Sequence, residues 1–156
     1  MEIFKMTESD LNYLTSHLNE YDNFWTSSIL KSEFSNSNST YLVIKEKNDI
    51  LGFGGIWFGY EEVHITNIAI RKDKRKQGLG TILFSKLIEN AQNNKNIYSA
   101  TLEVNEKNLP AINLYKKLGF KNTGLRKNYY NRMWKRNYYD KRILNKRRVY
   151  IWKKMN

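Results

Sequence analysis

A change in hydrophobic spacing near residue 78 constrains the fold of this chain most strongly. Before it, residues 41–45, 50–58 and 63–70 are rich in alternating apolar and β-branched residues, which predicts strands. From Gly78 to Asn90 the apolar residues follow a helical spacing, and 98–104 is predicted to be a strand again. A strand, a glycine turn, a helix and a strand form a βαβ unit with parallel strands and a right-handed crossover. The sequence therefore predicts an α/β fold with a mixed sheet.

Shorter elements are predicted on both sides of this unit. At the N-terminus we expect a strand over Ile3–Met6, a helix from a cap at Thr7 or Ser9 to about Leu18, a helix over Ser27–Phe34 and a polar loop over Ser35–Thr40. The turn at 46–49 is expected to join the first two strands of the sheet as a hairpin. Pro110 is expected to open a helix that runs to Leu118, with Gly119 as its left-handed stop and a strand from Phe120.

Composition excludes several classes of site. The chain of 156 residues favours a single domain, 1–156, and its 40% hydrophobic content allows a packed core. It has no cysteine and only His17 and His64 as histidines, so disulfides, a thiol nucleophile and a metal site are not expected. No basic region precedes an apolar run at the N-terminus, and no apolar stretch approaches the roughly 18 residues of a spanning helix. We expect a cytoplasmic protein with no membrane contact.

Positive charge is concentrated at the C-terminal end. Residues 126–156 carry 12 Lys and Arg against one acid, Asp140, and so hold +11 of the net +12. Within this basic tail, residues 131–148 are expected to form an extended loop or hairpin before a last strand over Val149–Lys153. The tail interleaves its basic residues with Tyr and Trp, as nucleic-acid-binding surfaces do. A solvated basic hairpin is the other interpretation.

A glycine-containing basic segment, 71–81, lies between a strand and the helix that follows it. Gly78 and Gly80 allow the backbone to approach a ligand, the helix N-terminus offers free N–H groups, and the Arg and Lys residues add charge for a diphosphate. No Gly-Lys-Ser/Thr follows, so the segment is not a P-loop, and Leu83 replaces the third glycine of the dinucleotide fingerprint. It is either a phosphate loop or an ordinary turn on a basic face.

The pattern Arg75-x-x-Gly78-x-Gly80 after Ile68-Ala69-Ile70 resembles the acetyl-CoA signature of the GNAT acetyltransferase superfamily. The segment from Leu102-Glu103-Val104 through Asn108 and Tyr115 to Gly119-Phe120 is similar to its second half. With His64–Ile70 and Asn128-Tyr129-Tyr130, the resemblance narrows to the RimI-like ribosomal-protein N-terminal alanine acetyltransferases, over about Gly52–Tyr130. It implies the GNAT fold: a mixed, mostly antiparallel sheet of about seven strands with a central splayed parallel pair, flanked by about four helices.

The same resemblance implies acetyl-CoA as cosubstrate. Its pantetheine arm would bind the backbone of the strand that ends the first motif, and its pyrophosphate would bind the loop. Asn108 would bond the pantetheine amide, although it could equally be a plain helix cap. The implied cofactor-binding residues are Ile68, Ala69, Ile70, Arg75, Lys76, Gln77, Gly78, Leu79, Gly80, Thr81 and Asn108.

Two residues are candidates for the chemistry of acetyl transfer. Glu103 lies in an otherwise apolar strand, where a charge is costly unless it faces a cleft, and is the candidate base. Its alternative is a solvent-facing position on an alternating strand. Tyr115 is the candidate acid for the leaving thiolate, with core packing on its helix as the alternative.

Trp57, Asn67 and Tyr130 are the candidates to line the acceptor groove, each with packing as its alternative, and His64 is expected to be a sheet histidine. The resulting hypothesis is acetylation of a protein N-terminal α-amine, for example of a ribosomal protein. The alternatives are a GNAT enzyme acting on a small amine, antibiotic or lysine, and a ribosome- or RNA-binding module that uses the basic tail.

Overall fold

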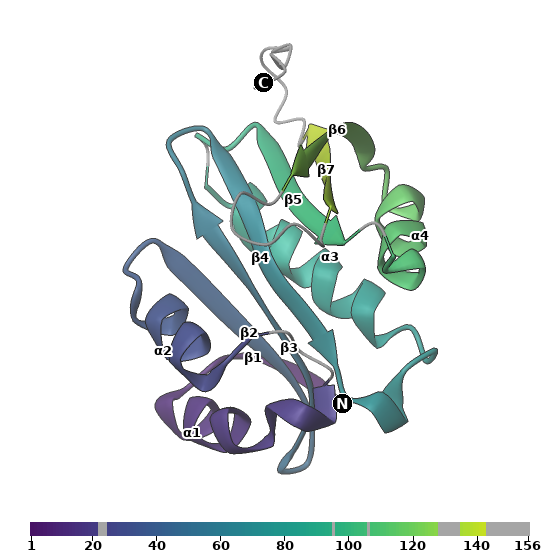
Figure 1. Ribbon diagram of the computed structural model, residues 1–156. Helices are drawn as coiled ribbons and strands as arrows, with labels where there is room; N and C mark the ends of the chain where they lie inside the picture. Colours follow the sequence, from purple (N-terminus) through teal and green to yellow (C-terminus); the bar gives the residue numbers. More distant parts are fainter. Residues whose placement is uncertain (22–24, 95, 106, 128–134, 143–156) are drawn as a thin grey trace.

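One seven-stranded sheet runs through the part of the chain that the computed structural model describes, residues 1–21, 25–94, 96–105, 107–127 and 135–142, with backbone alone from 123 (Figure 1). Its order is β1-β2-β3-β4-β5-β7-β6. The strands are β1 Glu2–Lys5, β2 Ser39–Glu46, β3 Asp49–Phe58, β4 Glu62–Ile70, β5 Ser99–Asn105, β6 Lys121–Lys127 and β7 Lys135–Arg142. The α-helices are α1 Glu8–His17, α2 Ser27–Ser35, α3 Leu79–Gln92 and α4 Leu109–Lys117. Two short 3-10 helices, η1 Leu18–Tyr21 and η2 Lys72–Lys74, complete the list.

The sheet is antiparallel except at its centre. β4 pairs with β5 in parallel from Glu62↔Ser99 to Ile65↔Leu102, and there the pairing stops. β4 continues to Ile70 bonded to β3, and β5 continues to Asn105 bonded to β7. The two strands therefore diverge after four residue pairs, as the splayed parallel pair of the sequence hypothesis requires. The predicted α/β class, mixed sheet and four helices are confirmed.

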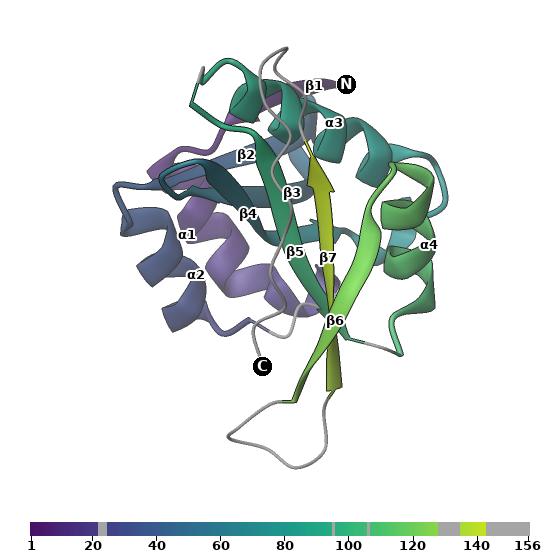
Figure 2. The ribbon, with the colours of Figure 1, turned by 90° about the horizontal axis from the view of Figure 1, so that it is seen from above.

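The helices cover opposite faces of the sheet, α1 and α2 on one and α3 and α4 on the other (Figures 1 and 2). The α3/α4 face is the larger core: Leu83, Phe84 and Leu87 of α3 and Ile112 and Tyr115 of α4 are buried with residues of β4 and β5. A second core joins Leu11, Leu14 and Leu30 to Tyr41 and Phe53. Side chains alternate across a strand, so each central strand serves both cores.

Local chemistry explains where the helices begin and end. Thr7, one of the two predicted caps, accepts from the Asp10 amide while the Asp10 carboxylate accepts from the Thr7 amide, a capping box. α4 follows the Asn108 cap with Pro110 in its first turn, and Gly119 has φ +87, as predicted. Each of these capping interactions joins residues that are at most four positions apart, so the sequence alone can predict them.

Part of the basic tail is a strand of the sheet. Residues 135–142 are strand β7, which pairs with β6 from Lys127↔Lys135 to Lys121↔Asp140 and with β5 along its other edge. Residues 135–142 of the 131–148 segment are therefore an inner strand of the sheet, where the sequence predicted an extended loop or a hairpin. The predicted last strand, Val149–Lys153, and residues 128–134 lie outside the described residues.

An ion pair ties the first helix to the sheet. The Asp10 carboxylate, 8% exposed, accepts from the Lys45 ammonium of β2 at 2.6 Å as well as from Thr7. Burial raises the pKa of Asp10, but the hydrogen bonds from Lys45 and Thr7 outweigh it, so the pKa lies below its ordinary value. The carboxylate therefore stabilises the fold above its ordinary pKa, and this stability is lost as pH falls through the folded-state value.

We expect Asp10→Asn to lower the free energy of unfolding by about 1–2 kcal/mol at pH 7, because it removes the capping and pairing charge. Urea denaturation at pH 7 and near pH 3 measures this, and the difference between the two proteins should be smaller at pH 3. Glu8→Gln is the matched control, since Glu8 is exposed in the same first turn. An equal difference between Asp10→Asn and the parent at both pH values would contradict the electrostatic explanation.

Candidate functional site

The N-terminus of α3 has the features of an anion-binding helix end. Gly78 caps the helix with φ +79 and no side chain bonds the helix end, whose first turn contains no acid. The first intrahelical bond runs from the Ile82 amide to the Gly78 carbonyl at 3.1 Å. The amides of Leu79, Gly80 and Thr81 precede that bond and point out of the helix end, where the helix dipole is positive. An anion placed there would satisfy all three.

Space beside this helix end depends on Gly80. A Cβ on Gly80 would lie 3.5 Å from Leu114 Cδ2 of α4 and 3.8 Å from Ile70 Cγ1 of β4, which is ordinary van der Waals contact. A methyl group therefore fits, whereas a large side chain would occupy the approach between α3, α4 and the end of β4. The glycine keeps that approach open.

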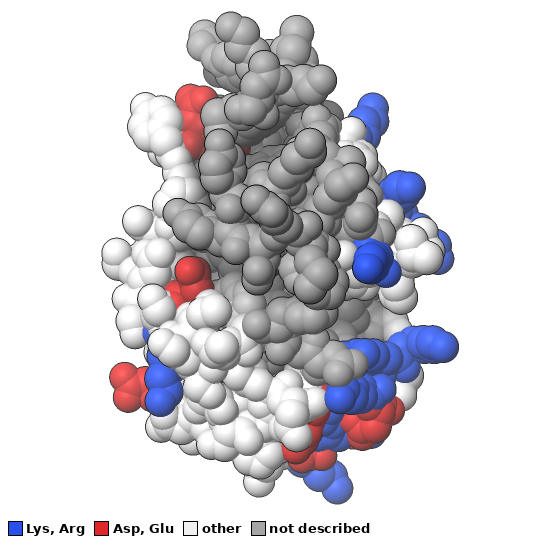
Figure 3. Space-filling model, in the orientation of Figure 1, with Lys and Arg blue, Asp and Glu red and all other residues white. Residues whose placement is uncertain are grey.

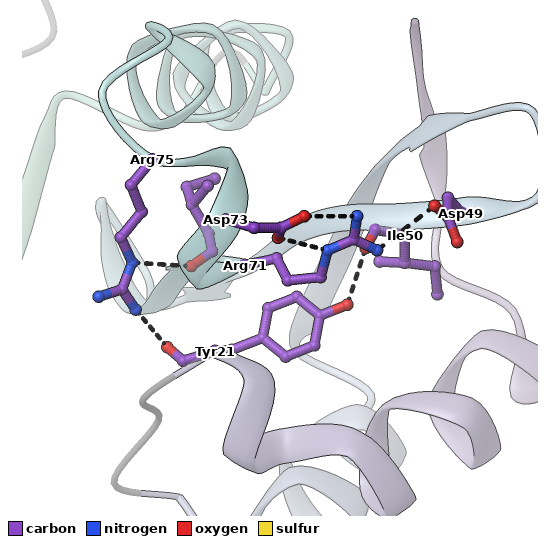
Figure 4. Close-up of polar contacts among 7 residues, drawn as sticks. Tyr21, Asp49, Ile50, Arg71, Asp73 and Arg75 are labelled. Carbon is purple, nitrogen blue, oxygen red and sulfur yellow. Dashed lines mark hydrogen bonds and ion pairs between the residues drawn. The ribbon is translucent and has the colours of Figure 1, made fainter.

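Basic side chains gather over the connection between β4 and α3 (lower right of Figure 3). Lys76 and Gln77 of this loop are exposed, as is Thr81 in the first helical turn. Lys76 has φ +59, which places it in the left-handed region beside the helix end. Arg75 is also predicted to bind the cofactor. Its guanidinium bonds two backbone carbonyls: Nε donates to Ile70 at 3.1 Å and Nη2 to Tyr21 at 2.9 Å (Figure 4).

The last residues of β4 provide an unpaired strand edge. Ile68, Ala69 and Ile70 follow the last β4–β5 pair and bond β3 on one side only. Ala69 is buried toward the α1/α2 core, while Ile68 and Ile70 are half-buried against the α3/α4 core. Among the described residues β5 no longer pairs with this edge, although the Ile70 carbonyl accepts from Arg75 Nε. The remaining backbone groups on the edge that faces β5 are left for an extended ligand, which fits the pantetheine role that the resemblance implies.

Glu103 lies on the opposite face of the sheet from α3 and α4. Its neighbours Leu102 and Val104 are buried in the α3/α4 core, so alternation directs Glu103 to the α1/α2 face. The residue is half-buried one position beyond the point where β5 separates from β4.

Tyr115 is on the other face, at 8% exposure in the α3/α4 core. Its ring lies 5.7 Å from that of Phe84 and 6.1 Å from that of Phe120, so the packing interpretation describes the ring correctly. Burial raises the pKa of the Tyr115 phenol to about 12. The hydroxyl is consequently protonated at any physiological pH and acts as a hydrogen-bond donor.

Asn108 caps α4, which is one of the two roles predicted for it from the sequence. Its Oδ1 accepts from the Ala111 amide at 3.3 Å. The carboxamide NH₂ is the part of this exposed side chain that remains to donate to a ligand. A cap and a pantetheine contact are therefore compatible.

A β-bulge between β3 and β4 shapes the α1/α2 face of the sheet. Gly55 of β3 pairs with Asn67 and Ile56 pairs with Ile65, so Thr66 is an extra residue in β4. A Cβ on Gly55 would meet the Tyr41 ring, so Gly55 and its partner Asn67 face the α1/α2 side. Thr66 faces the same way, since its hydroxyl bonds the Tyr41 hydroxyl at 3.0 Å. No residue pattern signals this bulge, and the sequence analysis missed it.

The bulge brings Asn67 to the face that carries Glu103. Asn67 Nδ2 is buried and has no hydrogen-bond partner within the described part of the chain. An unpaired buried donor costs about 1–3 kcal/mol, which a ligand carbonyl at this position would recover.

Trp57, 36% exposed on β3, pairs with His64. His64 bonds Thr101 across the sheet at 3.0 Å, as expected of a sheet histidine, and Tyr130 lies outside the described residues.

Two other classes of site find no support within the described residues. No three His, Asp or Glu side chains among them gather as metal ligands. None of the helices described is long and apolar enough to cross a membrane.

Comparisons with known proteins agree with this geometry. The model of the acetyltransferase (GNAT) family matches residues 3–120. A Bacillus subtilis protein named as a candidate [ribosomal protein bS18]-alanine N-acetyltransferase is 40% identical over 107 residues, 68% of this chain and 70% of its own.

Two solved structures share the fold. The Escherichia coli ribosomal-protein-S18-alanine N-acetyltransferase covers 96% of this chain and 99% of its own, with a TM-score of 0.83 at 23% identity. Arabidopsis thaliana NAA60 in complex with acetyl-CoA has a TM-score of 0.78 at 16% identity, over 91% of this chain and 98% of its own. With the open anion site on α3 and the diverging strands beside it, the family match shows that this chain belongs to the GNAT acetyltransferases, which are acetyl-CoA-dependent enzymes.

Proposed function

We propose that this enzyme acetylates the N-terminal α-amine of a protein, with a ribosomal protein as the natural acceptor class. The observation that carries the proposal is the arrangement around the divergence of β4 and β5: an open anion site, an unpaired strand edge, and a carboxylate and a phenol on opposite faces. The names of the Bacillus subtilis and Escherichia coli relatives support the choice of acceptor.

The pKa of the acceptor favours an α-amine. An α-amine has a pKa near ~7.7 and a lysine ε-amine near ~10.4, so neutralising the former at pH 7 costs about 3.7 kcal/mol less. A single carboxylate that works through a water molecule is a sufficient base for that step. Glu103 is the residue that we propose for this role, and Asn67 and Trp57, which lie on the same face, are the contacts that we propose for the acceptor peptide.

Acetyl-CoA is held by backbone more than by side chains. In this arrangement the pyrophosphate binds the amides of residues 77–81, the pantetheine arm lies along the unpaired edge at 68–70, and Asn108 donates to one of its amides. The neutral amine attacks the thioester carbonyl, a C–N bond forms, and the C–S bond breaks as electrons pass to sulfur. The amine proton leaves toward Glu103.

Tyr115 stabilises the leaving thiolate by a hydrogen bond. A phenol with a pKa of about 12 is a weaker acid than a thiol, whose ordinary pKa is about 8.5. Complete proton transfer from Tyr115 to sulfur would therefore be uphill by roughly 5 kcal/mol. A donated hydrogen bond to the developing negative charge avoids that cost.

Ribosome or RNA binding by the basic tail stays a prediction. Contact of residues 126–156 with ribosomal RNA would rest on side chains that lie outside those described.

The acceptor class is tested with a panel of amines at pH 7. We expect a peptide with a free N-terminal alanine to be acetylated, because its α-amine is partly neutral there. There are three comparison substrates: the same peptide with a blocked N-terminus and an internal lysine, free spermidine, and an aminoglycoside. Release of the free thiol of coenzyme A measures turnover. Faster turnover of spermidine or the aminoglycoside would overturn the proposed acceptor while leaving the acetyltransferase assignment intact.

The cofactor site is tested with two substitutions at one position. Gly80→Trp should weaken acetyl-CoA binding by roughly 100-fold in calorimetry, because the indole fills the approach to the helix amides. Gly80→Ala is the matched control, since its methyl group meets only ordinary contacts, and its affinity should stay within a few fold. Circular dichroism checks that both variants are folded. Unchanged affinity in folded Gly80→Trp would place the pyrophosphate elsewhere.

The two chemical roles predict different kinetic defects. Glu103→Gln should lower turnover of the free-amine peptide most below about pH 8, where the α-amine is largely protonated, and less above it. Tyr115→Phe keeps the ring packing and should lower turnover by roughly 10²-fold with acetyl-CoA affinity within a few fold. Glu46→Gln, an exposed carboxylate at the β2–β3 turn, is the control for charge loss. A pH-independent Glu103→Gln defect, or equal loss of affinity and turnover in Tyr115→Phe, would contradict these roles.

A further inference from the structure

Two arginines hold the two ends of the loop before α3. Arg71 bonds Asp73 through Nε at 2.7 Å and Nη2 at 3.2 Å, and its Nη1 lies 3.5 Å from an Asp49 carboxylate oxygen at the β2–β3 turn (Figure 4). Arg75 bonds the Ile70 and Tyr21 carbonyls. The first arginine fixes the start of the loop to the sheet, and the second fixes its end to η1.

Tyr21 is a rigid anchor for Arg75. The residue is 1% exposed, its hydroxyl donates to the Ile50 carbonyl at 2.8 Å, and its ring lies edge-on to Phe53 at 5.5 Å. Its carbonyl ends a short 3-10 helix, where the partial charge is negative and a guanidinium is favoured. A side chain 54 positions along the chain is thus held by a fixed point in the α1/α2 core.

The conformation that Arg75 supports has an intrinsic cost. Lys76 directly follows it at φ +59, in the left-handed region, where the Cβ of a non-glycine residue comes too close to the following carbonyl oxygen. Without an external restraint, the loop would relax to other conformations and would have to be reordered when an anion binds. The two carbonyl contacts of Arg75 supply that restraint beforehand.

We propose that Arg75 is a positioning residue, which holds the loop so that the α3 amides face the pyrophosphate, and not a ligand of the phosphates. The inference rests on the proposed placement of acetyl-CoA at this loop. The guanidinium fork bonds two carbonyls that a point-charge ammonium cannot reach together, so the role depends on shape as well as charge. A phosphate ligand at this position would depend chiefly on charge.

Arg75→Lys and Arg75→Gln separate the two roles. A positioning role predicts that both variants weaken acetyl-CoA binding about equally, by roughly tenfold in calorimetry at constant salt, because neither makes both carbonyl contacts. With saturating acetyl-CoA, kcat should stay within about twofold, since the reacting groups lie elsewhere. Lys74→Gln is the matched control, because it removes one charge from the same loop, and its affinity should hardly change.

Three results would overturn the proposal. Near-parental affinity in Arg75→Lys with weak binding in Arg75→Gln would identify Arg75 as a phosphate ligand. If Lys74→Gln weakened acetyl-CoA binding as much as the Arg75 variants do, the effect would come from the charge of the loop alone. If both Arg75 variants bound acetyl-CoA with parental affinity, Arg75 would have no role in binding. Melting temperatures show whether each variant is folded. Partial unfolding would lower kcat in proportion to the folded fraction, but the molecules that stay folded would bind acetyl-CoA with parental affinity. Unchanged binding in folded Gly80→Trp would instead refute the pyrophosphate placement, so the two failures are distinguishable.

Discussion

The short parallel contact between β4 and β5 is the constraint on which the rest of the structure depends. Four residue pairs join an antiparallel half made of β1 to β4 to a second antiparallel half made of β5, β7 and β6. The α3/α4 core, with residues from both strands, holds the halves together where backbone pairing has ended. The sheet can therefore diverge at its centre without coming apart, and the divergence leaves backbone groups of β4 free for a ligand.

The divergence also explains why the candidate groups are divided between two faces. A continuous sheet would separate Glu103 on one face from Tyr115 on the other by a closed layer of backbone. In the arrangement that we propose, the thioester lies between the diverging strands, with the amine on the face of Asn67 and Glu103 and the Tyr115 phenol on the helical face. The bulge at Thr66 contributes because it directs Asn67 to the acceptor side.

Much of the architecture was predictable because its signals are local. The capping box at Thr7, the proline of α4, the left-handed glycine at 119 and the change of period after residue 78 each act over a few residues, and each element lies within two or three residues of its predicted bounds. Strand β7 was harder to predict because its partners are set by β5 and β6. Its own residues are basic and aromatic, which suits a loop or an edge as well as an inner strand.

Sequence alone determined the family, the glycine-rich helix end and the residue types available for chemistry, because these depend on residues close together in the chain. Tertiary structure alone decided what those residues do. Arg75 bonds a carbonyl 54 residues away, and a bulge without a sequence signal leaves Asn67 Nδ2 as a buried donor. Burial of Tyr115 among Phe84 and Phe120 raises its phenol pKa to about 12 and keeps the hydroxyl protonated. Each of these depends on which distant residues the fold brings together, and one-dimensional spacing does not encode that proximity.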